Sequence, residues 1–352
     1  MDELELKEDT TQEVVDTETP LDKNVRLMSP NQMLIRRFFR SKLSILGLVM
    51  VVGLFVFCFL GPLFYTQWGE TELDRSGKLE YSTAVHTYTV DGVEYTVRQT
   101  NEKVVIDNFL APASASHPLG TDNQGYDILA RLMYGGRVSL LVSFMTVILM
   151  TIFGVIMGGL AGYFGGWVDN VIMRICDILM CLPGVPILLI LSSAMDGWVS
   201  MDFVEEEMRI YILMLFLTMI SWSGTARLVR GQILSLREQE FMVAAEAMGY
   251  STGRKIFKHL IPNVMPQLIV QMSLSLGSMI LYEATLSYLN MGIKAPYTAW
   301  GSMINIITSD PNILQNYPLV WVPAGVCIVI AVLGFNFVGD GLRDALDPKA
   351  RR

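Results

Sequence analysis

Charged side chains inside long apolar stretches are the residues of this sequence whose types and spacing suggest chemistry. Arg174 and Asp177 stand three residues apart, which places them on one face of a helix where they can pair. A charge within an apolar helix is costly and marks a functional position by default. Here the spacing favours an internal ion pair that fixes the rotation of the helix over a contact with a transported substrate.

Other polar or helix-breaking residues occur in the same kind of stretch. Pro183 and Pro186 predict a kink, and kinks let a helix open and close. Glu283 either lines a pathway or bonds a neighbouring helix, and Asn336 with Asp340 predicts a polar cluster at a helix end. The candidate pathway or gating residues are therefore Arg174, Asp177, Pro183, Glu283 and Asn336.

Catalytic and metal-binding patterns are missing from the sequence. It contains no G-x-x-x-x-G-K-[ST], no H-E-x-x-H and no G-x-S-x-G string. His86, His117 and His259 lie in different loops, so we expect no metal site, no catalytic residue and no enzyme. A membrane protein without its own energy source is a channel, a gradient-driven carrier, a receptor, or a subunit driven by a partner.

Composition places the chain in a membrane. Of its 352 residues, 52% are hydrophobic and 17% are charged, whereas charged residues make up about a quarter of a soluble domain. A spanning helix needs about 20 mostly apolar residues. Six stretches meet this length, and they predict an all-α integral membrane protein with spans at 43–65, 138–164, 171–194, 208–226, 263–289 and 319–338.

The distribution of basic residues orients these spans. Arg36, Arg37 and Arg40 precede the first span, and short cytoplasmic flanks are the ones that carry Lys and Arg. Both termini and the loop between the fourth and fifth spans are therefore predicted on the cytoplasmic side. The segment between the first two spans then lies outside.

That outer segment contains a hairpin signal and two helix-capping carboxylates. The string TYTVDGVEYTV alternates around Asp91-Gly92, a strong signal for a two-residue hairpin turn. Because isolated hairpins are marginally stable, we expect this one to pack on a neighbour. It is either a plain insertion or an element that docks a partner. Asp122 and Asp127 are expected to cap a helix that leads into the second span.

The cytoplasmic loop at 235–262 predicts two short helices. Ser235-x-x-Glu238 is a capping box that starts the first helix, and Gly249 ends it as a left-handed C-cap. Pro262 marks the re-entry into the bilayer. One narrow apolar face of the first helix is formed by Phe241, Ala244, Ala245 and Met248, and the second helix has an apolar face at Ile256, Phe257, Leu260 and Ile261.

This loop resembles the EAA loop of ABC importer permeases, whose pattern is E-A-A, three residues, G, nine residues, I-x-L-P. Four positions match, namely Ala244, Ala245, Gly249 and Pro262, and three differ, namely Val243, His259 and Ile261. The strings HPLGTDNQGYDILARLMYGGRVSL, EATLSYLNMGI and FNFVGDGLRDALDP resemble the C-type permease of the dipeptide/oligopeptide/nickel importer family. The resemblance runs from residue 33 to the end of the chain.

The resemblance implies a type I ABC importer permease fold in a bacterial cytoplasmic membrane. Its partners are a homologous B-type permease, two ATPase subunits that bind ATP and Mg, and an extracytoplasmic binding protein that delivers peptides. The alternative substrates for the same kind of importer are nickel chelates or another small solute. A secondary carrier, from a different class, is expected to show an internal repeat. The resemblance implies that the following residues couple the permease to the ATPases: Glu238, Phe241, Val243, Ala244, Ala245, Met248, Gly249 and Pro262.

The sequence thus divides into four parts. Residues 1–32 form an acidic, disordered cytoplasmic tail, 33–65 the first span with its flank, 66–137 the outer segment, and 138–352 a five-helix core that includes the 235–262 loop.

Deleting residues 1–22 is expected to leave transport intact. This segment holds nine acidic residues against one basic residue and has no apolar face for docking. Uptake by cells that carry the shortened chain checks this, and loss of the assembled complex would show that the tail binds a partner.

Overall fold

The computed structural model describes residues 30–75, 79–105 and 108–346 and is built mainly from helices. Residues 1–29 of the predicted tail lie outside the described residues, and its last three residues differ from the prediction because α1 begins at Pro30. Two short π-helical turns, η1 (Val56–Leu60) and η3 (Lys255–Leu260), and a 3₁₀ turn, η2 (Glu206–Met208), join longer helices. The α-helices are α1 (Pro30–Phe38), α2 (Lys42–Phe55), α3 (Gly61–Phe64), α4 (Ile128–Phe164), α5 (Gly166–Cys181), α6 (Gly184–Ser200), α7 (Arg209–Arg237), α8 (Glu240–Ala247), α9 (Thr252–Arg254), α10 (Ile261–Tyr288), α11 (Trp300–Ser309), α12 (Pro311–Asn316) and α13 (Pro318–Leu346).

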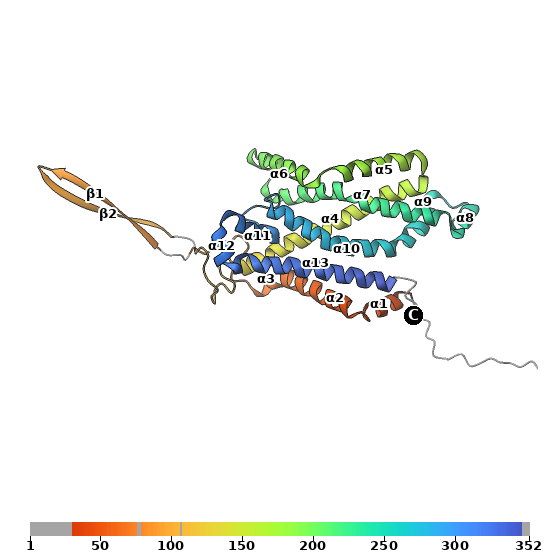
Figure 1. Ribbon diagram of the computed structural model, residues 1–352, viewed down its shortest axis with the longest axis horizontal. Helices are drawn as coiled ribbons and strands as arrows, with labels where there is room; N and C mark the ends of the chain where they lie inside the picture. The colour runs from red at the N-terminus through yellow and green to blue at the C-terminus, as the bar shows by residue number, and fades with distance from the viewer. Residues whose placement is uncertain (1–29, 76–78, 106–107, 347–352) are drawn as a thin grey trace, which may run out of the picture.

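Five of the helical stretches are long and apolar enough to cross a membrane. They are Lys42–Phe64, Ile128–Phe164, Arg209–Arg237, Thr252–Tyr288 and Pro318–Leu346. A sixth span exists if the bent pair of α5 and α6 is counted as one. The long helices run side by side, with α8 and α1 at one end of the bundle and α11 and α12 at the other (Figure 1).

The third predicted span is broken rather than kinked. The α5 and α6 helices meet at an angle of 80°, with Leu182 and Pro183 in extended conformations between them. A residue that precedes proline is driven out of the helical region by the proline ring, so the helix ends at Cys181. Pro186 stands in the first turn of α6, where its missing N–H is tolerated.

The closest helix packing joins α4 to α7. Gly154, Gly158 and Gly162 recur every four residues on α4, and each faces the backbone or side chains of α7. Small residues at this spacing let two backbones approach closely, which is how helices associate in lipid. The α13 helix packs in turn against α2 and α10, and α10 against α4, so one core joins the long helices.

A two-stranded antiparallel ribbon projects from the bundle. Strands β1 (Leu79–Val90) and β2 (Val93–Val105) pair with Val90 opposite Val93. Asp91 and Gly92 both have positive φ, at 51° and 75°, as a type I′ turn requires. The predicted hairpin is confirmed.

The expectation that the hairpin packs on a neighbour is wrong for the described residues. Its strands extend away from the helices at the end opposite α8 (Figure 1). Side chains between residues 85 and 98 are exposed on both faces. Each strand is more than twice the usual length, and the turn fits its twist, so backbone pairing holds the ribbon.

The Gly158→Ala substitution should lower the free energy of unfolding by about 1–3 kcal/mol, which is the usual cost of overpacking. The new Cβ would fall against the Ala226 carbonyl oxygen and the Val229 side chain. Gly159→Ala is the matched control, because there the nearest atom is Ile233 Cδ1 at 3.8 Å. Thermal unfolding of the two purified variants checks this, and equal stability of both would contradict the close α4–α7 contact.

Candidate functional sites at the two ends of the bundle

The α8 helix is held at the end of the bundle by a small core of its own. Met242 and Ala245 are buried, and Met242 packs with Val229 and Ile233 of α7 and with Leu260 of η3. Gly249 ends the helix with φ of +72°, which confirms the left-handed cap. The segment is therefore a fixed part of the fold and not a free loop.

The opposite face of α8 is exposed and apolar. Ala244 and Ala247 are exposed, and the Val243 and Met248 side chains are 62% and 61% exposed. Small side chains at the centre of this face leave room for another backbone to approach. Of the four residues expected on one face, the structure exposes Ala244 and Met248, half-buries Phe241, and turns Ala245 toward its own chain.

One boundary prediction in this loop is wrong. Ser235 lies inside α7, which continues to Arg237, and Glu238 is its C-cap, so no capping box starts a helix there. The next helix starts after Gln239 instead. The helix from Thr252 to Tyr288 continues through Pro262, and the role of this proline at the re-entry into the bilayer stays a prediction. The π turn of η3 ends just before this proline and absorbs the lost backbone hydrogen bond.

The α5 helix is held mainly by ion pairs to another helix. The expected ion pair within α5 contributes less. Arg174 and Asp177 are 3.9 Å apart, with the Arg174 side chain largely exposed. The Asp177 carboxylate is closer to Arg227 of α7, at 2.5 Å. Arg230 of α7 donates two hydrogen bonds to Asp169. The orientation of α5 is thus set by α7.

The two remaining candidate pathway residues face neighbouring helices. Glu283 is 2% exposed, and the Ser287 hydroxyl one turn later donates to its Oε1 at 2.7 Å. No hydrogen-bond partner is present for Glu283 Oε2 within the described residues. Asn336 of α13 lies opposite Gly277 of α10. For Glu283, the structure favours bonding within the helix bundle.

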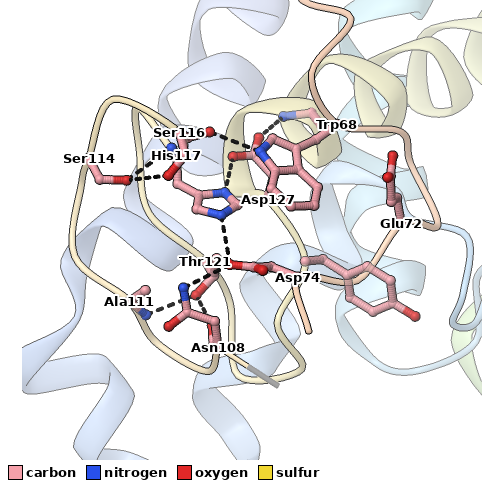
Figure 2. A network of polar contacts seen from close by, with 12 residues as sticks. Trp68, Glu72, Asp74, Asn108, Ala111, Ser114, Ser116, His117, Thr121 and Asp127 are labelled. Atoms are coloured by element: carbon pink, nitrogen blue, oxygen red, sulfur yellow. Dashed lines mark hydrogen bonds and ion pairs between the residues drawn. The ribbon is translucent and has the colours of Figure 1, made fainter. Parts of the chain in front are cut away.

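At the ribbon end, a buried histidine joins two distant carboxylates (Figure 2). The His117 ring is 2% exposed, with Nδ1 2.8 Å from Asp127 Oδ2 and Nε2 3.1 Å from Asp74 Oδ2. The Trp68 indole stacks on the imidazole with 4.6 Å between ring centroids. Asp127 also caps α4, because its Oδ1 accepts from the Ala130 N–H at 2.7 Å. The predicted capping role of Asp127 is confirmed.

The residues of the H-x-x-G-T-D-x-x-G-x-D string each have a place in this network. Gly120 and Gly125 have φ of +85° and +90°, a region that glycine enters without strain. Thr121 Oγ1 accepts from the Ala111 N–H at 2.8 Å and donates to the Asn108 carbonyl. Asp122 accepts two backbone N–H groups of the following turn and pairs with Arg131 at 2.9 Å.

Two groups at this end have raised pKa values. Burial and the neighbouring Asp127 carboxylate raise the pKa of the Tyr65 phenol, which donates to Asp127 Oδ2 at 3.1 Å. Burial also raises the pKa of Glu70, although the Thr298 N–H donates to it. Both groups are partly buried, and this burial is the main cause of the two raised pKa values.

Sequence reasoning missed His117 and Asp74. The motif string itself was the available signal, but Asp74 lies 43 residues earlier and the ribbon separates the two. It also missed Asp196 of α6, which pairs with the fully buried Arg209 and with Lys294. Among the described residues, no group of three or more His, Cys, Asp or Glu side chains is arranged to hold a metal ion.

Comparison with known proteins identifies the family. The sequence profile described as "binding-protein-dependent transport system inner membrane component" matches residues 154–352, more than half of the chain. A second profile, "N-terminal TM domain of oligopeptide transport permease C", matches residues 29–76. The chain belongs to this family of membrane transport permeases.

Curated relatives cover nearly the whole permease. The oligopeptide transport system permease protein OppC of Bacillus subtilis is 34% identical over 90% of this chain and 88% of its own length. The dipeptide transport system permease protein DppC of Alkalihalophilus pseudofirmus is 33% identical over 94% of each chain. The glutathione transport system permease protein GsiD of Pectobacterium atrosepticum is 32% identical over 94% of each chain.

Charging the two faces of α8 in this permease should have different structural effects. Ala245→Asp places a carboxylate at a position that is 1% exposed, so we expect amide exchange in α8 to become at least about tenfold faster, because burying an unpaired charge is costly. Ala244→Asp, on the exposed face, should leave that exchange unchanged. Hydrogen exchange followed by mass spectrometry checks both, and equal effects would contradict the assignment of the buried face.

Proposed function

We propose that this permease is the C-type membrane subunit of an ATP-driven importer of peptides. It forms the pathway together with a homologous B-type permease, and an extracytoplasmic binding protein delivers the substrate. The exposed apolar face of α8, held rigidly by its own core, is the observation that carries the proposal. The relatives named for oligopeptide, dipeptide and glutathione transport support peptides as the substrate class.

The α8 face is the proposed contact with an ATPase subunit. Val243, Ala244, Ala247 and Met248 form an exposed apolar patch, which is flanked by the exposed side chains of Glu240 and Glu246. Such a patch on a helix suits insertion into a groove on a partner. ATP and Mg are bound by the ATPases in this proposal, and this chain supplies no cofactor and no catalytic group. Glu238, Phe241, Gly249 and Pro262 then shape the contact rather than form its centre.

A movement of α8 can be transmitted directly to the far end of the bundle. The small core ties α8 to η3, and the helix from Thr252 runs without interruption to Tyr288. Glu283 lies near the far end of that helix, opposite α4. Closure of the ATPases would therefore displace α10 as one body. Pro183, at the break between α5 and α6, gives the neighbouring helix pair a place to change its angle.

The basic residues orient the proposed subunit. The α1 helix, which contains Arg36 and Arg37 and is followed by Arg40, lies at the α8 end of the bundle (Figure 1). The positive-inside rule places this end, with both termini, in the cytoplasm. The ribbon and the His117 network then face outward, on the side from which a binding protein delivers substrate.

Ala244→Asp should lower peptide uptake at least about tenfold, which corresponds to roughly 1.4 kcal/mol. Insertion of an unpaired carboxylate into an apolar interface costs more than this. Uptake of a labelled peptide by cells that express the variant at the wild-type level measures the effect. Ala244→Ser is the matched control on the same face, and Thr308→Asp, at an exposed position of α11, controls for added charge.

Affinity purification from native membranes in mild detergent completes the test. Wild type and both controls should bring down a second permease and ATPase subunits, whereas Ala244→Asp should lose the ATPases and keep the permease. A chain that purifies alone at every detergent strength, or normal uptake by Ala244→Asp, would overturn the coupling role and favour a secondary carrier.

A further inference from the structure

The His117 network is the built feature that the proposed coupling role leaves unused. We propose that His117 is a positioning residue, which holds a proton between Asp74 and Asp127 and thereby fixes the base of the ribbon to α4. The functional part of this proposal rests on the proposed import function, because it concerns how the outer segment meets an extracytoplasmic partner.

Hydrogen-bond capacity is the first argument. Both ring nitrogens lie within hydrogen-bond distance of a carboxylate oxygen, at 2.8 and 3.1 Å. A neutral imidazole has one donor and one acceptor nitrogen, and an ionised carboxylate only accepts. Both contacts are therefore satisfied only when the ring carries two protons, or when one of the two carboxyl groups is protonated. Either way the trio of His117, Asp74 and Asp127 holds one extra proton.

The second argument is what the two carboxylates are attached to. Asp74 precedes the ribbon and Asn108 follows it, and the two are joined by an Asn108 N–H to Asp74 O bond at 2.9 Å and a side-chain bond at 2.8 Å. Asp127 is the N-cap of α4, the helix that packs against α7 and α10. His117 thus connects the base of the ribbon to the core of the bundle through one ring (Figure 2).

Two aromatic side chains of the described residues contact this trio. The Trp68 ring covers one face of the imidazole, and Tyr65 donates a neutral hydrogen bond to Asp127. In the chain next to Asp74, Arg75 is exposed to solvent.

Other charges of the junction are engaged elsewhere. The Arg131 guanidinium is paired with Asp122 at 2.9 Å, and the Glu70 carboxyl accepts from the Thr298 N–H. Removing the extra proton therefore leaves an acceptor nitrogen facing a carboxylate, so one of the two ring contacts is lost. The link between the ribbon base and the start of α4 is weakened, and the backbone bond from the Asp74 N–H to the Gly125 carbonyl remains.

Asp74→Asn provides a sharp test, because an amide suits both states of the ring. Its oxygen accepts from a protonated ring nitrogen, and its NH₂ group donates to an unprotonated one, with the Asn108 amide turned over to match. Asp127→Asn keeps its amide oxygen on the Ala130 N–H as the helix cap and turns its NH₂ group to His117 Nδ1, so it suits the ring without the extra proton. His117→Gln cannot donate to both carboxylates in any state.

The direct measurement is hydrogen exchange in the full complex at several pH values, corrected for the intrinsic exchange rate. The amides of Thr121 and Ile128 report on the junction, since they bond to Ala111 O and Gly120 O. In wild type we expect their protection to fall about tenfold or more as the pH rises and the extra proton leaves. Asp74→Asn should keep constant protection, and His117→Gln should have low protection throughout. The α8 amides should not change.

The functional measurement is the ratio of binding-protein-stimulated to basal ATPase activity at the same pH values. We expect the ratio to fall with rising pH in wild type and to stay level in Asp74→Asn. Because both complexes use the same binding protein, this difference excludes a pH effect on the binding protein itself. Identical pH profiles of protection in wild type and both Asn variants would overturn the proposal. If the exchange pattern is as predicted but the binding protein does not stimulate ATPase activity at any pH, the proton held by His117 is supported and the import function is contradicted.

Discussion

The close approach of α4 and α7 is the constraint on which the other helix contacts depend. In lipid there is no hydrophobic drive between helices, so association relies on van der Waals contact and interhelical polar bonds. Gly154, Gly158 and Gly162 bring the two backbones together. Because α7 is fixed there, its Arg227 and Arg230 can hold α5 through Asp177 and Asp169, and its far end can carry the small core beneath α8.

The α4 helix also connects the two ends of the molecule. Its N-terminus is capped by Asp127, a member of the trio with His117 and Asp74. Near its C-terminus the Tyr163 carbonyl accepts a hydrogen bond from Arg237 at 3.0 Å, close to the start of α8. One rigid helix therefore extends from the junction at the ribbon to the surface proposed for an ATPase. Together with α10, it gives the two surfaces a common support.

Several features followed from local rules and could be predicted. The turn at Asp91-Gly92, the cap at Gly249 and the Asp127 cap each depend on a few neighbouring residues and their backbone preferences. The errors arose where local rules competed. Ser235 and Glu238 fit a capping box, but α7 packs its residue Ile233 into the small core and continues past them. Pro183 was expected to bend a span, and it separates two helices instead.

The sequence by itself determined the class of protein, the number of apolar stretches and the family, because composition, hydropathy and motif strings are properties of neighbouring residues. Only the tertiary structure decided which way each side chain faces. Ala244 and Ala245 are adjacent and alike, yet one is exposed and the other is buried. Asp74 and His117 are separated by the whole ribbon and meet because the chain returns on itself. Such contacts depend on packing between distant segments, which no local pattern encodes.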